Sequence, residues 1–507
     1  MNNFSHRYSV LLIVLILLVY HAITINAQSY FVDECEELKH ASVGIVESIF
    51  MPDSMPPFFT LVLRGWLAIF DQRITARWLS VAFSLGTIIA TWAFTKRIVN
   101  DRVAILAAVL LAANPLQLFY AQLIRGYAMM TLVAALCIGF GMLARKTNEK
   151  KYWWLYGITS VVGMFSHYYF ITIPLSFLAL TISDWDFDRV RRFLVSSVLS
   201  GIASLPLLIF VHSDFTFQKE IRAPRPVSPS AVVYSYLSYF TGYSMGPSQR
   251  DLQTNYRWTA DTTMIAELTV VGLVAIIALA AAVPITRRYG ELKPFAFLLI
   301  VPLVVIGLLG AATGITYNVR FVAWMVVPMS MLLGFLAMHD ARNTKAGTAI
   351  FALRIGSILL LFGLANWNRV YVDRYKTEDI RSAMEWIDAH ATNPTIFVVS
   401  SYMGVVADYY KSEQQSVAPL PPLTHHPAEI NDETTLNVCL SKINEVSGNE
   451  FWVVYSRAFH SDANRLFIDA LLRNEGAIES FGMQTKFAGV VIYKGSIRKR
   501  VSTETFR

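Results

Sequence analysis

A short acidic run near the amino terminus carries the side chains that proton transfer requires. Asp33 and Glu34 stand at the start of the stretch 31–59, and Glu36 and Glu37 follow at once. A carboxylate that is partly shielded from water can have its pKa raised toward neutrality, which suits a general base. The alternative for each of these acids is a solvated position in a loop, and this is what we expect for Glu36 and Glu37.

A second set of polar residues interrupts sequence that is otherwise apolar. Arg125 stands in the short stretch 122–126, directly before Tyr127, and Arg320 precedes an apolar run. A guanidinium group pairs bidentately with phosphate, so either arginine could hold an anionic substrate. His167 lies at the end of another apolar run, where a histidine is costly unless it has a partner. Snorkelling arginines and interfacial tyrosines are the structural alternatives.

The composition determines what kind of chain must position these residues. Of the 507 residues, 54% are hydrophobic and 16% are charged, whereas soluble domains have about 25% charged residues. The mean hydropathy is +0.45, which indicates a polytopic membrane protein. The net charge of +7 does not indicate nucleic acid as a partner, because most Lys and Arg residues stand in short loops between apolar runs.

The apolar runs predict about eleven transmembrane helices and a cytoplasmic amino terminus. With that orientation every alternate short loop is basic, as the positive-inside rule requires. The basic pairs include Lys96-Arg97, Arg145-Lys146 and Arg287-Arg288. The predicted spans are 8–26, 74–95, 102–120, 127–144, 152–167, 169–183, 192–211, 263–285, 294–312, 320–338 and 347–365.

The same orientation divides the chain into a membrane domain, 1–366, and an extracytoplasmic domain, 367–507. Two long connections of the membrane domain also lie outside, at 27–73 and 212–262. Within the first, the stretch 58–70 is apolar but too short to span, so we interpret it as an interfacial helix. The carboxy-terminal domain alternates predicted helices (377–390, 462–472) with predicted strands (395–400, 451–455, 489–493), which indicates a small α/β fold.

Several motifs occur in a fixed order along residues 8–370. These are Asp33-Glu34, Pro56-Pro57-Phe58-Phe59, Arg77 with Ser80, Asn114-Pro115, Tyr120-Ala121-Gln122, Arg125-Gly126-Tyr127, His167-Tyr168-Tyr169, and Tyr317 with Arg320-Phe321. The order resembles that of the GT-C superfamily of membrane glycosyltransferases. More narrowly, it resembles bacterial relatives of protein O-mannosyltransferases and of the aminoarabinose transferases that modify lipid A. One departure is Ile124, where many relatives have Glu or another polar residue.

The resemblance implies a fold, a reaction and a set of roles. The chain is expected to be a hexosyl- or pentosyltransferase of the cell envelope. It would move a sugar from a polyprenyl-phosphate donor to an extracytoplasmic lipid, glycan or protein. Asp33 is the expected general base, Arg125 the expected ligand of the donor phosphate, and Tyr127, His167 and Arg320 further substrate-binding residues. Glu34 could bind the acceptor or a divalent cation, and no other cofactor is indicated.

Two other functions fit a polytopic chain of this composition. A transporter or lipid flippase would have charged residues in the middle of the membrane and inverted halves with broken helices. Here the charged residues gather at the ends of the predicted spans, and the sequence shows no internal repeat. A structural component of a larger envelope complex is the third reading. The chain has no Walker motif and no dinucleotide-binding fingerprint, which argues against ATP-driven transport.

Overall fold

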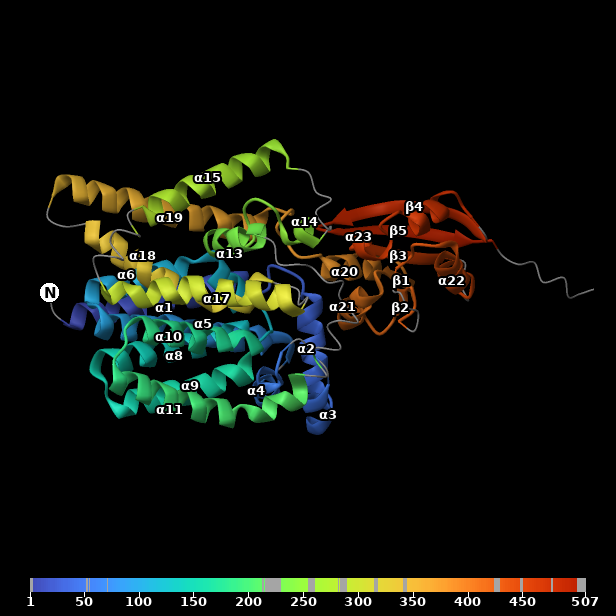
Figure 1. Ribbon diagram of the computed structural model, residues 1–507. Coiled ribbons are helices and arrows are strands. Elements are labelled where there is room, and N and C mark those ends of the chain that lie inside the picture. The colour runs from blue at the N-terminus through green and yellow to red at the C-terminus, as the bar shows by residue number, and fades with distance from the viewer. Residues whose placement is uncertain are drawn as a thin grey trace, which may run out of the picture. The chain divides into compact units, whose positions relative to one another are not determined.

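The chain forms two compact units in the computed structural model of Figure 1. The first unit comprises Met1–Ile25, Glu37–Pro247 and Ala260–Asn368, and the second comprises Asn26–Glu36, Ser248–Thr259 and Arg369–Arg507. The structure describes residues 3–51, 53, 55–70, 72–211, 214, 229–253, 260–280, 282, 290–313, 318–340, 344–423, 429–446, 450–475 and 477–498. Tyr317 and three parts of the predicted loop 212–262, namely 212–213, 215–228 and 254–259, lie outside the described residues.

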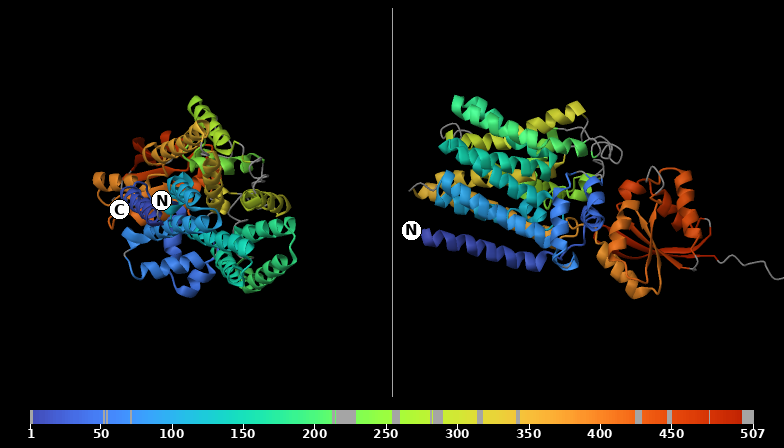
Figure 2. Two further views of the ribbon diagram at one scale, coloured as in Figure 1. Left: turned by 90° about the vertical axis from the view of Figure 1, so that its left-hand side faces the viewer. Right: turned by 90° about the horizontal axis from the view of Figure 1, so that it is seen from below.

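The first unit is built from helices that run side by side (Figure 2). Its α-helices are α1 (Asn3–Thr24), α3 (Ile45–Phe50), α4 (Phe58–Leu67), α5 (Gln72–Ile98), α6 (Asp101–Ala113), α7 (Pro115–Ala121), α8 (Tyr127–Thr147), α9 (Lys150–Ser166), α10 (Thr172–Ser183), α11 (Phe187–Ala203), α13 (Pro229–Thr241), α15 (Thr262–Leu279), α17 (Lys293–Thr313), α18 (Val326–Asp340) and α19 (Lys345–Tyr371). Short 3₁₀ turns precede α10 and α18, at η1 (Tyr168–Ile171) and η4 (Val319–Met325). Helix α2 (Val32–Ser42) contains the boundary between the two units.

Six of the described helices are long and apolar enough to cross a membrane, or up to eight if two bent helix pairs each form one span. The prediction of a polytopic helical membrane protein is therefore confirmed, whereas the count of eleven spans is not. The shortfall comes partly from the predicted spans 8–26, 152–167 and 169–183, because the apolar part of α1 (Tyr8–Thr24), helix α9 and the segment Tyr168–Ser183 have at most 17 residues each. A span of a typical bilayer needs about 20 residues.

Helix α8 and the segment formed by η4 and α18 lie at the centre of the first unit. Their most apolar windows are 83% and 94% buried, compared with 22% for α15 and 28% for α19. Helix α5 packs closely on α8, and a Cβ atom at Gly139 would lie 2.2 Å from the ring of Phe94. The glycine therefore permits this close approach. The residues at the beginning of α8 and of η4 are consequently held by the best-packed helices of the unit.

The second unit contains a five-stranded sheet in the order β2-β1-β3-β5-β4. Strands β1 (Thr395–Val399), β2 (Ser416–Leu420) and β3 (Glu450–Ser456) are parallel, and β4 (Ile478–Phe487) and β5 (Val490–Ile497) add an antiparallel hairpin. Its helices are α14 (Gln249–Gln253), α20 (Ile380–His390), α21 (Gly404–Tyr410), α22 (Glu433–Asn444), α23 (Ala458–Ser461) and α24 (Leu466–Leu472). The predicted small α/β fold is present, with a sheet of mixed direction.

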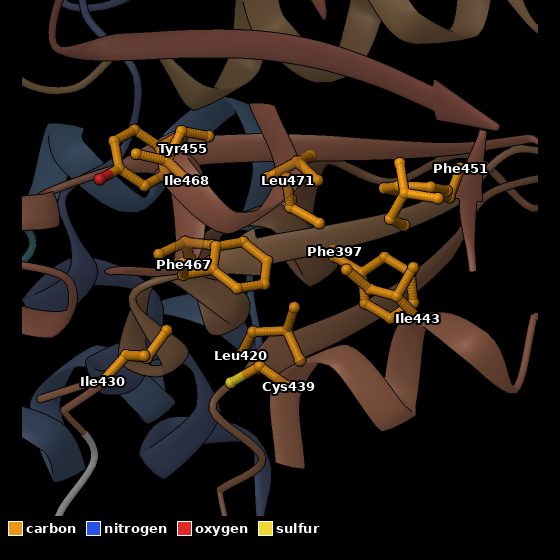
Figure 3. Packing of buried hydrophobic residues seen from close by; sticks show 13 residues of the cluster. Phe397, Leu420, Ile430, Cys439, Ile443, Phe451, Tyr455, Phe467, Ile468 and Leu471 are labelled. Carbon is orange, nitrogen blue, oxygen red and sulfur yellow. The ribbon is translucent and has the colours of Figure 1, made fainter. Parts of the chain in front are cut away.

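A buried apolar cluster packs α22 and α24 against the sheet (Figure 3). Phe397 of β1, Leu420 of β2 and Phe451 of β3 contribute side chains from the sheet, and Cys439 and Phe467 contribute them from the helices. All five are at most 3% exposed. The second unit therefore has a hydrophobic core of its own, independent of the helices of the first.

The stability of the second unit is expected to depend on Phe467. Replacing it with Ala removes a fully buried aromatic ring and should lower the free energy of unfolding of this unit by about 3–5 kcal/mol. Hydrogen exchange of the amides in β1 and β3 measures the loss in the full chain. Met483→Ala, at a position of β4 that is 62% exposed, is the control and should change stability by less than about 0.5 kcal/mol. Unchanged exchange in Phe467→Ala would contradict the assignment of this core.

Candidate functional site

Arg125 stands in the short connection between α7 and α8. The backbone of this connection is held in place by two hydrogen bonds to the carbonyl of Leu123. One comes from the backbone N–H of Arg125 and the other from the hydroxyl of Ser80 in α5 (2.6 Å). The side-chain amide of Gln122 contacts His21 and Thr24 of α1 at 3.0 and 2.7 Å. Helices α1 and α5 thus fix the segment that carries the arginine, and its side chain is only 3% exposed.

Two carboxylates surround the guanidinium of Arg125. Asp53 accepts two hydrogen bonds, 2.9 Å from Nη2 and 3.0 Å from Nη1, in a bidentate arrangement. Glu37 of α2 accepts a third from Nη1 at 2.8 Å and also a hydrogen bond from the hydroxyl of Thr60 in α4. We call these three charged side chains, Arg125, Asp53 and Glu37, the arginine cluster. Arginine is the residue best suited to such forked pairing with planar anions.

The prediction that Glu37 is solvated is wrong, because its side chain is buried with 1% exposure. Helix α2 buries Leu38 and Ala41 as well, so Glu37 lies on the inward side of the helix. Asp53 was not selected by the sequence analysis. It is an isolated acid in a proline-containing stretch, and no periodic pattern marks it. The helical phase of α2 was the available signal for Glu37, since Leu38 and Ala41 mark the buried side.

Asp53 is positioned from a distant part of the chain. Its backbone N–H donates to Oδ1 of Asp214 at 3.1 Å, and the hydroxyl of Tyr168 donates to the other oxygen of the same carboxylate. Burial raises the pKa of Asp214 to about 6. His40 of α2 lies beside Asp53, with Nδ1 3.8 Å from Oδ2, and burial lowers its pKa. Asp214 and His40 were also missed by the sequence analysis.

Tyr127, His167 and Arg320 lie together in the first unit. His167 is fully buried at the break between α9 and η1, with its ring centroid 6.1 Å from that of Tyr127. The guanidinium carbon of Arg320 lies 6.0 Å from the centroid of the Tyr127 ring. Both Arg320 and Arg125 interact electrostatically with His167. The structure therefore brings these four predicted site residues together from three separate connections of the helical unit.

The side chain of His167 has a defined tautomer in this arrangement. Its Nδ1 accepts a hydrogen bond from the backbone N–H of Tyr169 at 3.2 Å, so the proton of the neutral ring resides on Nε2. Nε2 is buried and has no hydrogen-bond partner among the described residues. A buried N–H group of this kind is costly unless another group accepts from it. A substrate oxygen could satisfy it.

Asp33 and Glu34 belong to the second unit. Asp33 lies half-buried in the first turn of α2. Glu34 is fully buried, and its carboxylate accepts a hydrogen bond from the backbone N–H of Phe31 at 2.8 Å. Glu34 therefore supports the first turn of the helix that carries Asp33.

Several hydrogen bonds join the chain before α2 to the rest of the second unit. The side chain of Gln28 donates to the carbonyl of Arg369 at 2.6 Å, and the hydroxyl of Ser29 donates to Asp379 at 2.7 Å. The backbone N–H of Tyr30 donates to the hydroxyl of Tyr410 at 2.8 Å. Residues 26–36, predicted as part of a loop of the membrane domain, are thus bound to the carboxy-terminal unit.

Among the residues that the structure describes, no three or more His, Cys, Asp or Glu side chains form a group that could hold a metal ion. The arginine cluster has two carboxylates, but a guanidinium occupies the space between them. What this part of the first unit can do chemically is to bind an oxyanion. It presents a buried imidazole N–H, a tyrosine about 6 Å from that ring, and two guanidinium groups that both act electrostatically on the histidine.

Residues 54–212 match the protein family described as dolichyl-phosphate-mannose-protein mannosyltransferase. This match includes Arg125, Tyr127 and His167. A comparison with curated proteins finds no match.

The fold of almost the whole chain recurs in solved structures. ArnT from Cupriavidus metallidurans, in the apo state, has a TM-score of 0.51 at 12% identity, covering 96% of this chain and 97% of that chain. The same protein bound to undecaprenyl phosphate has a TM-score of 0.52 at 13% identity, with the same coverage. The archaeal oligosaccharyltransferase AglB from Archaeoglobus fulgidus, in complex with an inhibitory peptide and a dolichol-phosphate, has a TM-score of 0.50 at 11% identity, covering 94% of this chain and 73% of that chain.

Both of these solved proteins are GT-C glycosyltransferases. The resemblance predicted from the motifs is thus confirmed: the chain is a multi-pass membrane protein with the fold of the GT-C superfamily, and its residues 54–212 are similar to the mannosyltransferase family.

Proposed function

We propose that the protein is a glycosyltransferase that moves a sugar from a polyprenyl-phosphate donor to an acceptor hydroxyl outside the cytoplasm. The observation that carries the proposal is the buried Arg125, held in a forked ion pair next to Arg320, His167 and Tyr127. Membrane proteins of this fold have been solved with undecaprenyl phosphate and with a dolichol-phosphate, which supports a donor of the same class. The acceptor is a lipid, a glycan or a protein, and the sugar is a hexose or a pentose.

The donor phosphate is assigned to Arg125 and Arg320. In the reaction the bond between the sugar and the phosphate breaks, so that negative charge accumulates on the leaving phosphate. Positive groups that are fixed in place before the reaction stabilise this charge. Arg125 supplies two parallel N–H donors, while Tyr127 and the buried Nε2–H of His167 are assigned to oxygens of the phosphate or the sugar.

Asp33 is proposed as the general base. As the bond between the acceptor oxygen and the anomeric carbon forms, the proton of the acceptor hydroxyl passes to the carboxylate of Asp33. Its half-buried place in the first turn of a helix supports this role, because the carboxylate is partly shielded from water and still accessible to an acceptor. Glu34 is assigned to the acceptor side of the site, where its capping of the first turn of α2 also keeps Asp33 in position.

We further propose the full topology predicted from the loop charges. In this topology the shorter apolar helices cross the membrane as well. The chain then has eleven spans, and its amino terminus lies in the cytoplasm. The segment 27–73 and the carboxy-terminal domain, 367–507, are then extracytoplasmic. In this topology Asp33 and Arg125 both lie on the extracytoplasmic side of the membrane, where the lipid-linked sugar would be presented.

The charge state of Glu37 affects how the phosphate can bind. Burial raises the pKa of Glu37 to about 7, although the charge of Arg125 opposes the shift. Near neutral pH a fraction of Glu37 is therefore protonated, and Asp53 is then the counter-ion of Arg125. An incoming phosphate would compete with one carboxylate in that state and with two when Glu37 is ionised.

Replacing Asp33 with Asn should abolish transfer while the protein remains folded and inserted. The loss of a general base typically lowers the rate by about 10²–10⁴-fold. Mass spectrometry of envelope glycans and lipids from a deletion strain identifies the missing sugar, and complementation with the variant then tests the residue. Glu36→Gln, at an exposed position of α2, is the matched control and should restore the product. Full restoration by Asp33→Asn would overturn the assignment of the base.

Arg125→Lys keeps a positive charge between the two carboxylates but removes the fork of donors. Transfer should fall by about tenfold or more, since a hydrogen bond to a charged group contributes about 1.5–3 kcal/mol. The same complementation assay measures the loss, and immunoblotting of membranes confirms the protein level. Arg145→Lys is the control, because Arg145 is also largely buried and paired with a carboxylate, that of Asp184 at 3.1 Å. Equal losses in the two variants would count against a special role for Arg125.

The raised pKa of Glu37 predicts a pH dependence of stability. The folded protein binds this proton more tightly than the unfolded chain, whose glutamate has a pKa of about 4.5. The stability that Glu37 contributes is therefore present at low pH and is lost as the pH rises through about 7. Pulse proteolysis in detergent between pH 5 and 7.5 should show a smaller decline for Glu37→Gln than for the wild type. Glu47→Gln, at an exposed position of α3, should leave the wild-type decline unchanged.

A further inference from the structure

The sheet of the second unit contains a topological switch point. The chain passes from β1 to β2 on one side of β1 and later enters β3 on the other side. All three strands are parallel, so the connections that follow β1 and β3 leave the same edge of the sheet in opposite directions. In open α/β sheets, ligands bind at this position, beyond the carboxyl ends of the strands.

The backbone beyond this edge adopts an unusual conformation at two residues. Ser400, directly after β1, has a φ of 41°, and Arg457, directly after β3, has a φ of 49°. The hydroxyl of Ser400 donates to the carbonyls of Ser456 and Arg457, at 3.0 Å each, which joins the two strand ends. Left-handed conformations of residues other than glycine cost free energy and cluster at ligand sites.

A cleft with about 250 Å³ of empty space, including its opening to solvent, begins at Arg457. Four cationic side chains line the cleft: Arg457, Arg250, Arg374 and Lys376. Glu378 is the acidic residue in its lining. These side chains come from α14, from the segment before α20 and from the end of β3, so the fold gathers them from separate parts of the chain.

The cations of the cleft differ in how their charges are balanced. Arg457 forms a buried pair with Glu378, with contacts of 2.9 and 3.0 Å. Acids next to the cleft pair with two of the others: Asp251 lies 3.2 Å from Arg374, and Asp373 lies 2.8 Å from Lys376. Arg250 instead donates to the backbone carbonyl of Asp373. Arg250 also interacts electrostatically with Glu378, but this carboxylate is already paired with Arg457, so Arg250 retains positive charge that can attract an anion.

We propose that this cleft of the second unit is a binding site for a phosphate-type anion, either free phosphate or the phosphate of a lipid headgroup. Arg250 would supply the main contact and Lys376 a second one at the opening. The arginine–glutamate pair of Arg457 and Glu378 forms the rigid back of the cleft, and Phe31 stacks on Arg457 at 4.8 Å. The site is separate from the donor site assigned to Arg125, and its occupation does not depend on the proposed transferase reaction.

Hydrogen exchange of the full-length protein in phosphatidylcholine nanodiscs tests the site directly. Inorganic phosphate is titrated in one arm, and nanodiscs that contain phosphatidylglycerol replace it in the other. The peptides that cover 248–251 and 373–378 should become protected. Arg250→Gln and Lys376→Gln should each raise the phosphate concentration, or the fraction of phosphatidylglycerol, at half-maximal protection by about tenfold. Arg473→Gln, an exposed arginine of the same unit outside the cleft, should leave it unchanged.

Each outcome of this experiment decides the proposal. Protection by inorganic phosphate that Arg250→Gln weakens supports a site for the free anion. Protection by phosphatidylglycerol alone, weakened in the same way, supports a lipid headgroup. Protection in neither arm, or protection that both cleft variants leave unchanged, overturns the proposal. Because the readout is local to these peptides, a chain that fails to transfer sugar but retains the protection would refute the proposed function and leave the anion site standing.

Discussion

The burial of one positive charge governs the architecture of the candidate site. A guanidinium that is removed from water must be paired, because an unpaired buried charge costs several kcal/mol. Arg125 meets this requirement with Asp53 and Glu37, which lie 72 and 88 residues away in the sequence. The connection between α7 and α8, helix α2 and the segment around Asp53 must therefore come together for the first unit to fold. The interaction that makes an oxyanion site also stabilises the structure around it.

This requirement extends beyond the three charged side chains. Asp53 is held by Asp214, and Asp214 by Tyr168, so the arginine cluster depends on a residue that follows α11 and on the turn after α9. His167, the neighbour of Tyr168, faces the ring of Tyr127 and is reached by the charges of both arginines. An anion that displaces Asp53 from Arg125 would act on the same residues that position the histidine. In the proposed reaction, donor binding would therefore be coupled to the local order of these connections through shared hydrogen bonds.

The structure brings together four of the residues that the motifs selected, each of which interrupts an apolar run. A polar side chain at the end of a membrane helix must find a partner, so Arg125, Tyr127, His167 and Arg320 were recognisable one by one. Asp53 offered no such signal, since a lone acid in a proline-containing stretch looks like an ordinary loop residue. Its partner, Asp214, is 161 residues away, a pairing that no local pattern encodes. In the second unit, β2 was missed for a similar reason, because its sequence SVAPL contains Pro419, which is atypical of a strand.

Helix α2 was expected to be part of one acidic loop. The boundary between the two units divides it, so the start of α2 also belongs to the unit that contains the basic cleft. Phe31 lines the basic cleft and stacks on Arg457, and its backbone N–H is bound by Glu34 in the first turn of α2. Asp33 lies between these two residues in sequence. An anion that draws Arg250 and its neighbours together would shift Arg457. Because the ring of Phe31 stacks on Arg457, the shift would reach the first turn of α2, which carries the proposed base. The residues of the second unit that bind the proposed anion would then also influence the position of Asp33.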